Sequence, residues 1–203
     1  MKSHTMTKFL LIRHATTSAV GRRLSGRMPG VYLNEEGRLQ AQKLSERLAG
    51  LPLKAVYSSP LSRTVETALP ICKMFNIENV ISENFMEIEF GDWTNRQIDQ
   101  IAHEPEFQLF NSFRSSTRIP GGESMLEAQL RMLQGLEKLC LQHPGEMVAI
   151  VSHSDMIKAT IAHYAGIHLD MLQRIEISPA SISVIEIYEE TARILLVNDT
   201  GGF

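Results

Sequence analysis

The sequence predicts an α/β fold, a three-layer helix-sheet-helix sandwich whose sheet is mostly parallel with an antiparallel margin. Residues 9–12 and 147–151 are continuous apolar runs, which is typical of strands buried on both faces of a parallel sheet. Helix-like and strand-like segments alternate through most of the chain, which favours parallel strands joined by helical crossovers. Residues 182–187 and 193–197 follow one another without a helix between them, so they predict the antiparallel margin.

Composition and charge narrow the class of protein. A chain of 203 residues is long enough for one large domain with its own core, so we expect a single domain over residues 1–203. The net charge of -3 gives no general attraction for nucleic acid or an anionic membrane, and any anion site must be a local cluster. Two cysteines without CxxC spacing, and a first apolar run too short for a membrane span, predict a cytoplasmic protein. Monomer and homodimer both remain open.

The elements of the first half can be placed by their caps and periodicity. Residues 18–30 have no periodicity and predict a long loop. Asn34 precedes two acidic residues and a helix over 35–49, and a short strand over 54–58 follows. The next helix repeats apolar residues at helical spacing, which predicts that one face is buried. That face is Val65, Ala68, Leu69, Cys72 and Phe75.

The second half contains an irregular stretch between regular elements. Residues 94–122 predict a helical, cap-like insertion, in which Phe107, Phe110 and Phe113 are more typical of internal packing than of a substrate clamp. A long helix is predicted over 123–141, and another after residue 153 that Gly166 ends. The face of the long helix that packs on the protein is expected to contain Leu126, Leu130, Leu133, Leu136 or Glu137, and Cys140.

Three predicted strands end in basic or imidazole side chains. Arg13 and His14 end the first strand, Arg63 follows the second, and His153 follows the apolar run over 147–151. The carboxyl ends of neighbouring parallel strands meet at one edge of a sheet, where such folds bind ligands. Two guanidinium groups and the amino ends of the following helices suit a phosphoryl group, and they keep a nearby imidazole neutral. One such pair alone would mean little, but three strand ends together predict a phosphoryl site.

Five motifs, in order, resemble the histidine phosphatase superfamily, which includes cofactor-dependent phosphoglycerate mutases and many phosphatases. They are Leu-Ile-Arg-His at 11–14, Ser-Ser-Pro-Leu-Ser-Arg at 58–63, Glu87 with Phe-Gly-Asp-Trp at 90–93, Pro-Gly-Gly-Glu-Ser at 120–124, and Val-Ser-His at 151–153. The resemblance runs from residue 9 to about residue 165. It is far more specific than any one motif.

The resemblance implies a phosphohistidine mechanism. His14 would attack phosphorus, and Arg13, Arg63 and His153 would hold the phosphoryl oxygens. Glu87 would protonate the leaving group and then activate water; the family pattern, not the spacing, selects it over Glu83 or Glu89. This chemistry needs neither a metal nor another cofactor, and the partner it implies is a small phosphorylated substrate.

Departures from the family pattern favour hydrolysis over mutase activity. Ala15 stands where Gly is usual after the nucleophile, and it predicts a turn with negative φ. Thr16 stands where Glu is frequent, and Ser154 where Gly is frequent. Mutases typically have Asn at the positions of Val20 and Asp155.

Side chains outside the motifs are candidates for reading the rest of the substrate. They are Arg22, Gly26, Arg27, Arg114, Arg118 and Ser154. A metal-dependent hydrolase using His14, His153 and Asp155 is less favoured, because two arginines would repel a cation and close-spaced ligand pairs are missing. Phosphoglycerate mutase-type transfer and a phosphate-binding module with a dead site both stay open.

Overall fold

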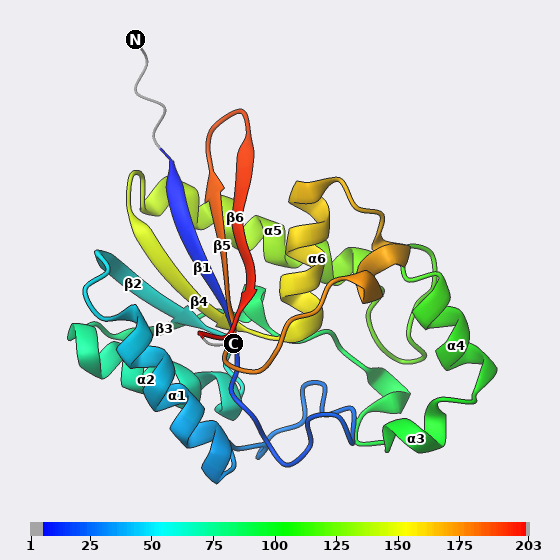
Figure 1. Ribbon diagram of the computed structural model, residues 1–203. Coiled ribbons are helices and arrows are strands. Elements are labelled where there is room, and N and C mark those ends of the chain that lie inside the picture. The colour runs from blue at the N-terminus through cyan, green and yellow to red at the C-terminus, as the bar shows by residue number, and fades with distance from the viewer. Residues whose placement is uncertain (1–5, 202–203) are drawn as a thin grey trace.

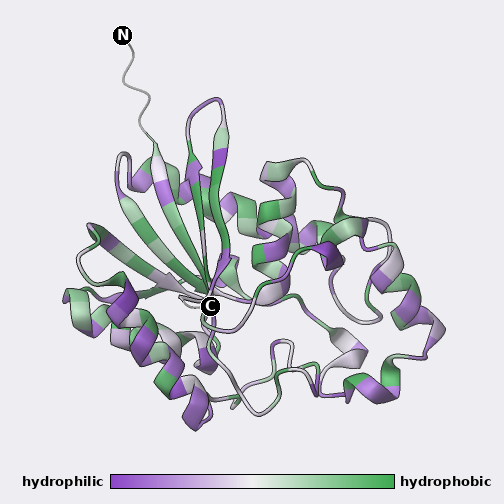
Figure 2. Cartoon of the chain, viewed as in Figure 1, coloured by the Kyte–Doolittle hydropathy of each residue, from purple (hydrophilic) through white to green (hydrophobic). Residues whose placement is uncertain are grey.

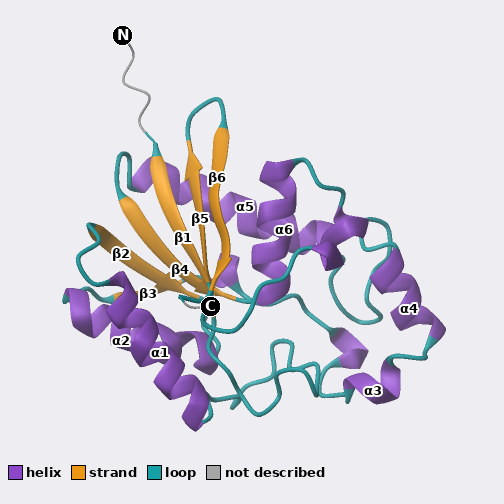
Figure 3. Ribbon diagram, viewed as in Figure 1, coloured by secondary structure: helices purple, strands orange, loops and turns teal. Residues whose placement is uncertain are grey.

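The computed structural model describes residues 6–201, and a six-stranded sheet forms its centre (Figures 1 and 3). The strand order is β3-β2-β4-β1-β5-β6. The strands are β1 (Thr7–Arg13), β2 (Leu53–Ser58), β3 (Asn79–Ile81), β4 (Met147–Ser152), β5 (Ile182–Ile187) and β6 (Ala192–Asp199). The first four are parallel, whereas β5 is antiparallel to both β1 and β6. The predicted mostly parallel sheet with an antiparallel margin is confirmed.

Helices cover both faces of the sheet. The α-helices are α1 (Glu35–Leu48), α2 (Ser62–Phe75), α3 (Ile98–Ile101), α4 (Pro105–Ser112), α5 (Met125–Gln142) and α6 (Ser154–Ala165). Short 3₁₀ turns are η1 (Glu83–Phe85), η2 (Gly91–Trp93) and η3 (Leu169–Arg174). The pair α1 and α2 lies on one side of the sheet, and α5 and α6 lie on the other (Figure 1).

The central strand β1 shows why the sheet is buried on both faces. Phe9 and Leu11 pack into the core formed with α5 and α6, whereas Leu10 and Ile12 pack into the core formed with α1 and α2. Alternate side chains of a strand point to opposite faces, so a continuous apolar run serves two cores at once. The strands are accordingly hydrophobic along most of their length (Figure 2). The polar side chains Arg13 and His14 follow this apolar run, at the carboxyl end of β1.

Helix boundaries follow the capping signals. The Asn34 side chain accepts a hydrogen bond from the Gly37 amide and starts α1. Ser124 and Glu127 form a reciprocal capping box at the start of α5. Gly166, with φ of 67°, ends α6 in the left-handed region, where a residue without Cβ is favoured.

The apolar faces expected for two helices were partly wrong. Leu69 on α2 and Leu126 and Leu130 on α5 are more than half exposed. In α5 the predicted Leu133 and Leu136 are buried, together with Ala128, Met132 and Leu139, which were not predicted. Apolar residues occupy two overlapping faces of α5 in the sequence. The face that packs against η1 and α6 is the one that contains the small Ala128 and the flexible Met132.

Residues 94–122 run beyond the carboxyl ends of the strands and contain α3 and α4 (Figure 1). Phe110 is fully buried and its ring lies 5.6 Å from that of Trp93, while Phe107 lies 5.2 Å from Trp93. Phe113 is about half exposed. Phe107 and Phe110 therefore pack internally, against the ring of Trp93 in η2.

No helix among residues 6–201 combines the length and the apolar character that crossing a lipid bilayer requires.

Candidate active site

A small pocket of about 170 Å³ lies at the carboxyl ends of β1, β2 and β4. Its walls come from the turn after β1, the loop over residues 19–26, the first turn of α2, the loop before η2, α3 and the start of α6. The lining residues are Arg13, His14, Thr17, Ala19, Val20, Gly21, Arg23, Leu24, Ser25, Gly26, Arg63, Glu87, Phe90, Ile98, Ser154 and Asp155. Parallel strands thus deliver distant parts of the chain to one edge of the sheet.

His14 is a neutral imidazole with one defined tautomer. Its Nδ1 lies 2.8 Å from the carbonyl oxygen of Ala15. A carbonyl only accepts hydrogen bonds, so Nδ1 carries the proton and Nε2 keeps its lone pair. Burial, and then the charge of Arg63, hold the pKa of His14 well below its ordinary value. The ring is therefore uncharged at neutral pH, with a free lone pair on Nε2.

Two guanidinium groups stand beside this imidazole, that of the buried Arg63 and that of the partly buried Arg13. Arg13 Nη1 donates to the carbonyl of Ile177 at 2.6 Å, and Arg63 Nη2 donates to the carbonyl of Gly26 at 2.7 Å. Arg13 Nε and Arg63 Nη1 are buried and have no hydrogen-bond partner among the described residues. Unpaired buried donors on two cations are costly. An anion with several oxygen atoms would satisfy them.

His153 follows β4, is the N-cap residue of α6 and lies near His14 and Arg63. Its Nε2 lies 2.9 Å from the Ser59 hydroxyl, and its ring centroid lies 5.4 Å from that of His14. Burial, followed by the charge of Arg63, keeps its pKa well below the ordinary histidine value. The two imidazoles are therefore both neutral.

Glu87 is one of the two carboxyl residues that line the pocket, and Asp155 is the other. Glu87 Oε1 accepts a hydrogen bond from the Ile88 amide at 3.0 Å, and Glu87 Oε2 lies 3.7 Å from His153 Nδ1. Burial, and then the negative charge of Asp155, raise the pKa of Glu87 to about 7, although Arg63 and Arg13 act in the opposite direction. A carboxyl with this pKa can give and take a proton near neutral pH.

Comparisons with known proteins agree with this geometry. The family model of the histidine phosphatase superfamily (branch 1) matches residues 9–200. The chain belongs to the histidine phosphatase superfamily. Its similarity to Phosphoserine phosphatase 1 of Hydrogenobacter thermophilus is 32% identity over 199 residues, covering 96% of this chain and 93% of that protein.

Other relatives include a Probable phosphoglycerate mutase GpmB of Salmonella choleraesuis. It is 31% identical over 191 residues, which cover 92% of this chain and 87% of that protein. Among solved structures, Bacillus stearothermophilus YhfR superimposes with a TM-score of 0.89 at 29% identity, covering 95% of this chain and 97% of that one. These relatives support phosphatase activity, and they include both phosphatase and mutase names.

In this member of the histidine phosphatase superfamily, the loop that presents Glu87 is held by side chains from elsewhere. Arg131 on α5 donates through Nη1 to the carbonyls of Glu83, Asn84 and Met86 at 3.1, 3.0 and 2.9 Å. Residues 86–90 form no helix or strand, so their backbone groups depend on such partners. This support was not predicted from the sequence, because its partners are main-chain atoms far away in the chain.

Glu123, which follows the glycine pair at 121–122, also holds the loop that presents Glu87. Its side chain accepts from the Glu89 amide at 3.1 Å and pairs with Arg131 at 3.1 Å and Arg27 at 2.8 Å. A Cβ at Gly122 would lie 2.2 Å from the Glu89 carbonyl oxygen, so glycine permits this close approach. The Pro-Gly-Gly-Glu motif therefore packs directly against the Glu87 loop.

The candidate substrate residues are placed differently from one another. Gly26 and Ser154 line the pocket. Arg27 instead donates to the Glu87 carbonyl at 2.8 Å and supports the loop. Arg114 is buried and pairs at 2.9 Å with Asp155, which lines the pocket. Arg118 lies on the surface and pairs with Glu127.

Arg22 is exposed on the loop after β1 and lines a neighbouring pocket.

The departures from the family pattern lie in the pocket or next to it. Ala15 is buried and its amide donates to the Thr67 hydroxyl at 3.0 Å, and its φ is not positive, so the expected unstrained turn is confirmed. Thr17, Val20 and Asp155 line the pocket. We did not predict Thr17 or Asp155 as wall residues. The strand-end argument could have found Asp155, because it belongs to the polar cluster that follows β4.

Among the described residues, no three His, Cys, Asp or Glu side chains are grouped to hold a metal ion.

Proposed function

We propose that the protein is a phosphomonoesterase that works through a covalent phosphohistidine on His14, with Glu87 as general acid and base. The observation that carries the proposal is the position of a neutral imidazole beside two arginines that each have a buried, unpaired donor atom. Such donors match the charge that develops on the phosphoryl oxygens during transfer.

In the first step, His14 Nε2 attacks phosphorus and the bond from phosphorus to the leaving oxygen breaks. Protonated Glu87 gives its proton to that oxygen, so the product leaves as a neutral alcohol. The phosphorylated imidazole is a cation. Its Nδ1–H still donates a hydrogen bond to the Ala15 carbonyl, and this bond stabilises the positive charge.

In the second step, the Glu87 carboxylate takes a proton from water, and the resulting nucleophile attacks phosphorus. The bond from nitrogen to phosphorus breaks, inorganic phosphate leaves, and His14 and Glu87 return to their starting states. A pKa of about 7 allows Glu87 to serve both steps. Arg13, Arg63 and His153 are the proposed contacts to the phosphoryl oxygens.

The proposed substrate is a small phosphorylated molecule, because the pocket of about 170 Å³ holds a phosphoryl group and only a few more atoms. The relative named a phosphoserine phosphatase supports a phosphorylated metabolite of this size. The positive charges of Arg13 and Arg63 at the reaction centre favour a reaction without a metal ion.

Phosphotransfer of the mutase type is the second candidate, since the GpmB relatives are similar along nearly the same length. Val20 and Asp155 line the pocket at two positions where the mutase pattern has Asn, and this difference supports hydrolysis.

The test is steady-state hydrolysis of p-nitrophenyl phosphate and a panel of phosphomonoesters, with and without a chelator. We expect the wild type to release phosphate equally in both conditions and His14→Ala to release none. Wild-type turnover in His14→Ala would rule out the nucleophile, and loss of turnover in chelator would rule out the metal-free chemistry.

A further inference from the structure

A second pocket adjoins the pocket of about 170 Å³ that contains His14, which we call the phosphoryl pocket. The second pocket has a volume of about 500 Å³ and shares Ala19 and Arg23 with the smaller one. Its other lining residues are Ser18, Arg22, Met28, Gly30, Val31, Tyr32 and Gln97. The loop that forms most of it crosses from the end of β1 toward α3 (Figure 1). A substrate too large for the inner pocket can therefore extend past Arg23 into this space.

The second pocket is positively charged. Two arginines, Arg22 and Arg23, line it, and none of its lining residues is acidic. Neither guanidinium forms an ion pair with a carboxylate of residues 6–201. Arg23 Nη1 donates at 2.7 Å to the neutral amide oxygen of Asn95, which leaves its charge uncompensated. This local charge contrasts with the net charge of -3 of the whole chain.

The arginines are held by an ordered backbone. The Ile98 amide donates to the Arg22 carbonyl at 2.9 Å, and the Leu24 amide donates to the Arg96 carbonyl at 3.0 Å. The Asn95 amide donates to the Leu24 carbonyl at 2.7 Å, and Arg23 and Gln97 form an antiparallel bridge. A fixed backbone reduces the entropy lost when a ligand binds.

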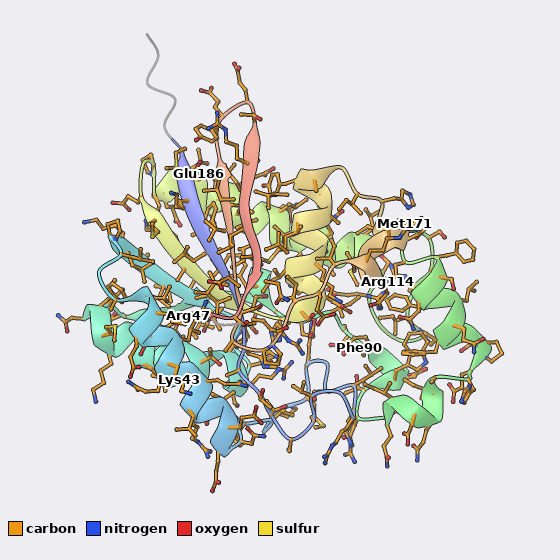
Figure 4. All side chains as sticks on the ribbon, in the orientation of Figure 1. Lys43, Arg47, Phe90, Arg114, Met171 and Glu186 are labelled. Carbon is orange, nitrogen blue, oxygen red and sulfur yellow. The ribbon has the colours of Figure 1, made fainter. Side chains whose placement is uncertain are left out.

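A larger cavity of about 1020 Å³ is lined in part by Lys43 and Arg47, which are labelled in Figure 4. Lys43 and Arg47 lie together on α1, and Phe90 and Arg114 lie on the other side of the strand ends. The cavity beside Lys43 and Arg47 also contains Glu36 and Glu46, so its charges are mixed. That cavity shares no lining residue with the phosphoryl pocket.

We propose that the second pocket binds an anionic group at the far end of the substrate. The preferred substrate class is then a phosphomonoester whose leaving group carries a carboxylate or a second phosphate, joined to the ester oxygen by a chain that passes Arg23. Tyr32 and Met28 supply an apolar wall for that chain. This inference rests on the proposed function, because it assumes that the reacting phosphoryl group occupies the inner pocket.

The test compares matched pairs of ligands. ω-Carboxyalkyl phosphates of increasing chain length are assayed against their neutral ω-carboxamides, and the corresponding phosphonates, which cannot be hydrolysed, are used in calorimetric binding. For exposed arginines we expect a preference of about fivefold for the carboxylate at the best chain length, declining with added salt. Arg22→Glu should abolish it.

Arg38→Glu is the control, because Arg38 is exposed on α1 and makes the same change of net charge outside both pockets. It should keep both the wild-type preference and the wild-type turnover of p-nitrophenyl phosphate. Equal binding of carboxylate and carboxamide phosphonates by the wild type would overturn the proposal, as would an undiminished preference in Arg22→Glu. A preference in binding without any turnover would instead refute the proposed phosphatase activity.

Discussion

Arg131 provides a sharp prediction because its role would be to position Glu87 and not to touch the substrate. In Arg131→Met, the carbonyls of Glu83, Asn84 and Met86 lose their donor, while a methionine stem still packs on α5. Hydrogen bonds to charged groups are worth about 1.5–3 kcal/mol each. Nη1 has two protons to share among three carbonyls, and the side chain is 21% exposed, so the total loss is about 2–3 kcal/mol.

Such a loss should leave the protein folded, since domains have about 5–15 kcal/mol of stability. The Glu87 loop, however, should move, and a general acid contributes about 10²–10⁴ in rate. We therefore expect turnover of alkyl phosphates to fall on the order of 100-fold. Turnover of p-nitrophenyl phosphate should fall much less, because its leaving group departs as an anion and needs no proton.

The assay is kcat/KM for both classes of ester in the wild type, Arg131→Met and Arg47→Met. Arg47 is a matched control, because it also binds a carbonyl and a carboxylate, both on Asp199, and is 24% exposed. It lies outside the phosphoryl pocket. Equal losses for alkyl and aryl esters in Arg131→Met would contradict a role in positioning the acid, and so would unchanged turnover of alkyl esters.

Two further predictions follow from single contacts. Asp155 raises the pKa of Glu87, and Glu87 must be protonated to begin the reaction, so Asp155→Asn should move the alkaline fall of kcat/KM to lower pH. A limb that stays near pH 7 or moves upward would disprove this coupling. In α1, a Cβ at position 37 would lie 2.0 Å from the Thr16 carbonyl oxygen, so Gly37→Ala should cost about 1–3 kcal/mol although alanine normally favours helices. Thermal unfolding measures it, with exposed Gln42→Ala as the control, and equal melting temperatures for the two variants would refute the close approach.

The fold was largely predictable because its signals are local or periodic. Residues 9–12 and 147–151 contain no polar side chain, which is typical of strands covered on both faces of a sheet. Asn34, Ser124 and Gly166 mark helix ends by their own chemistry. The face of α5 was not predictable in the same way, since leucines and methionines offer overlapping stripes and only the neighbouring elements choose between them.

The site was predictable where its residues end strands. Arg13, His14 and His153 could be brought together from topology alone. Glu87 could not, because spacing does not distinguish it from Glu83 or Glu89, and the family pattern was required. Arg131 carries no sequence signal at all, since its partners are carbonyl groups of any residue type. Contacts of this kind become visible only in three dimensions.

The most direct measurement of the central claim is to trap the covalent intermediate. The enzyme is mixed with a ³²P-labelled phosphomonoester and quenched within one turnover under alkaline conditions, which preserve phosphohistidine. The labelled peptide is then identified. The account predicts one acid-labile phosphate on Nε2 of His14 in the wild type and none in His14→Ala. Label on another side chain, or steady turnover without any trapped phosphate under conditions that preserve a phosphohistidine standard, would contradict it.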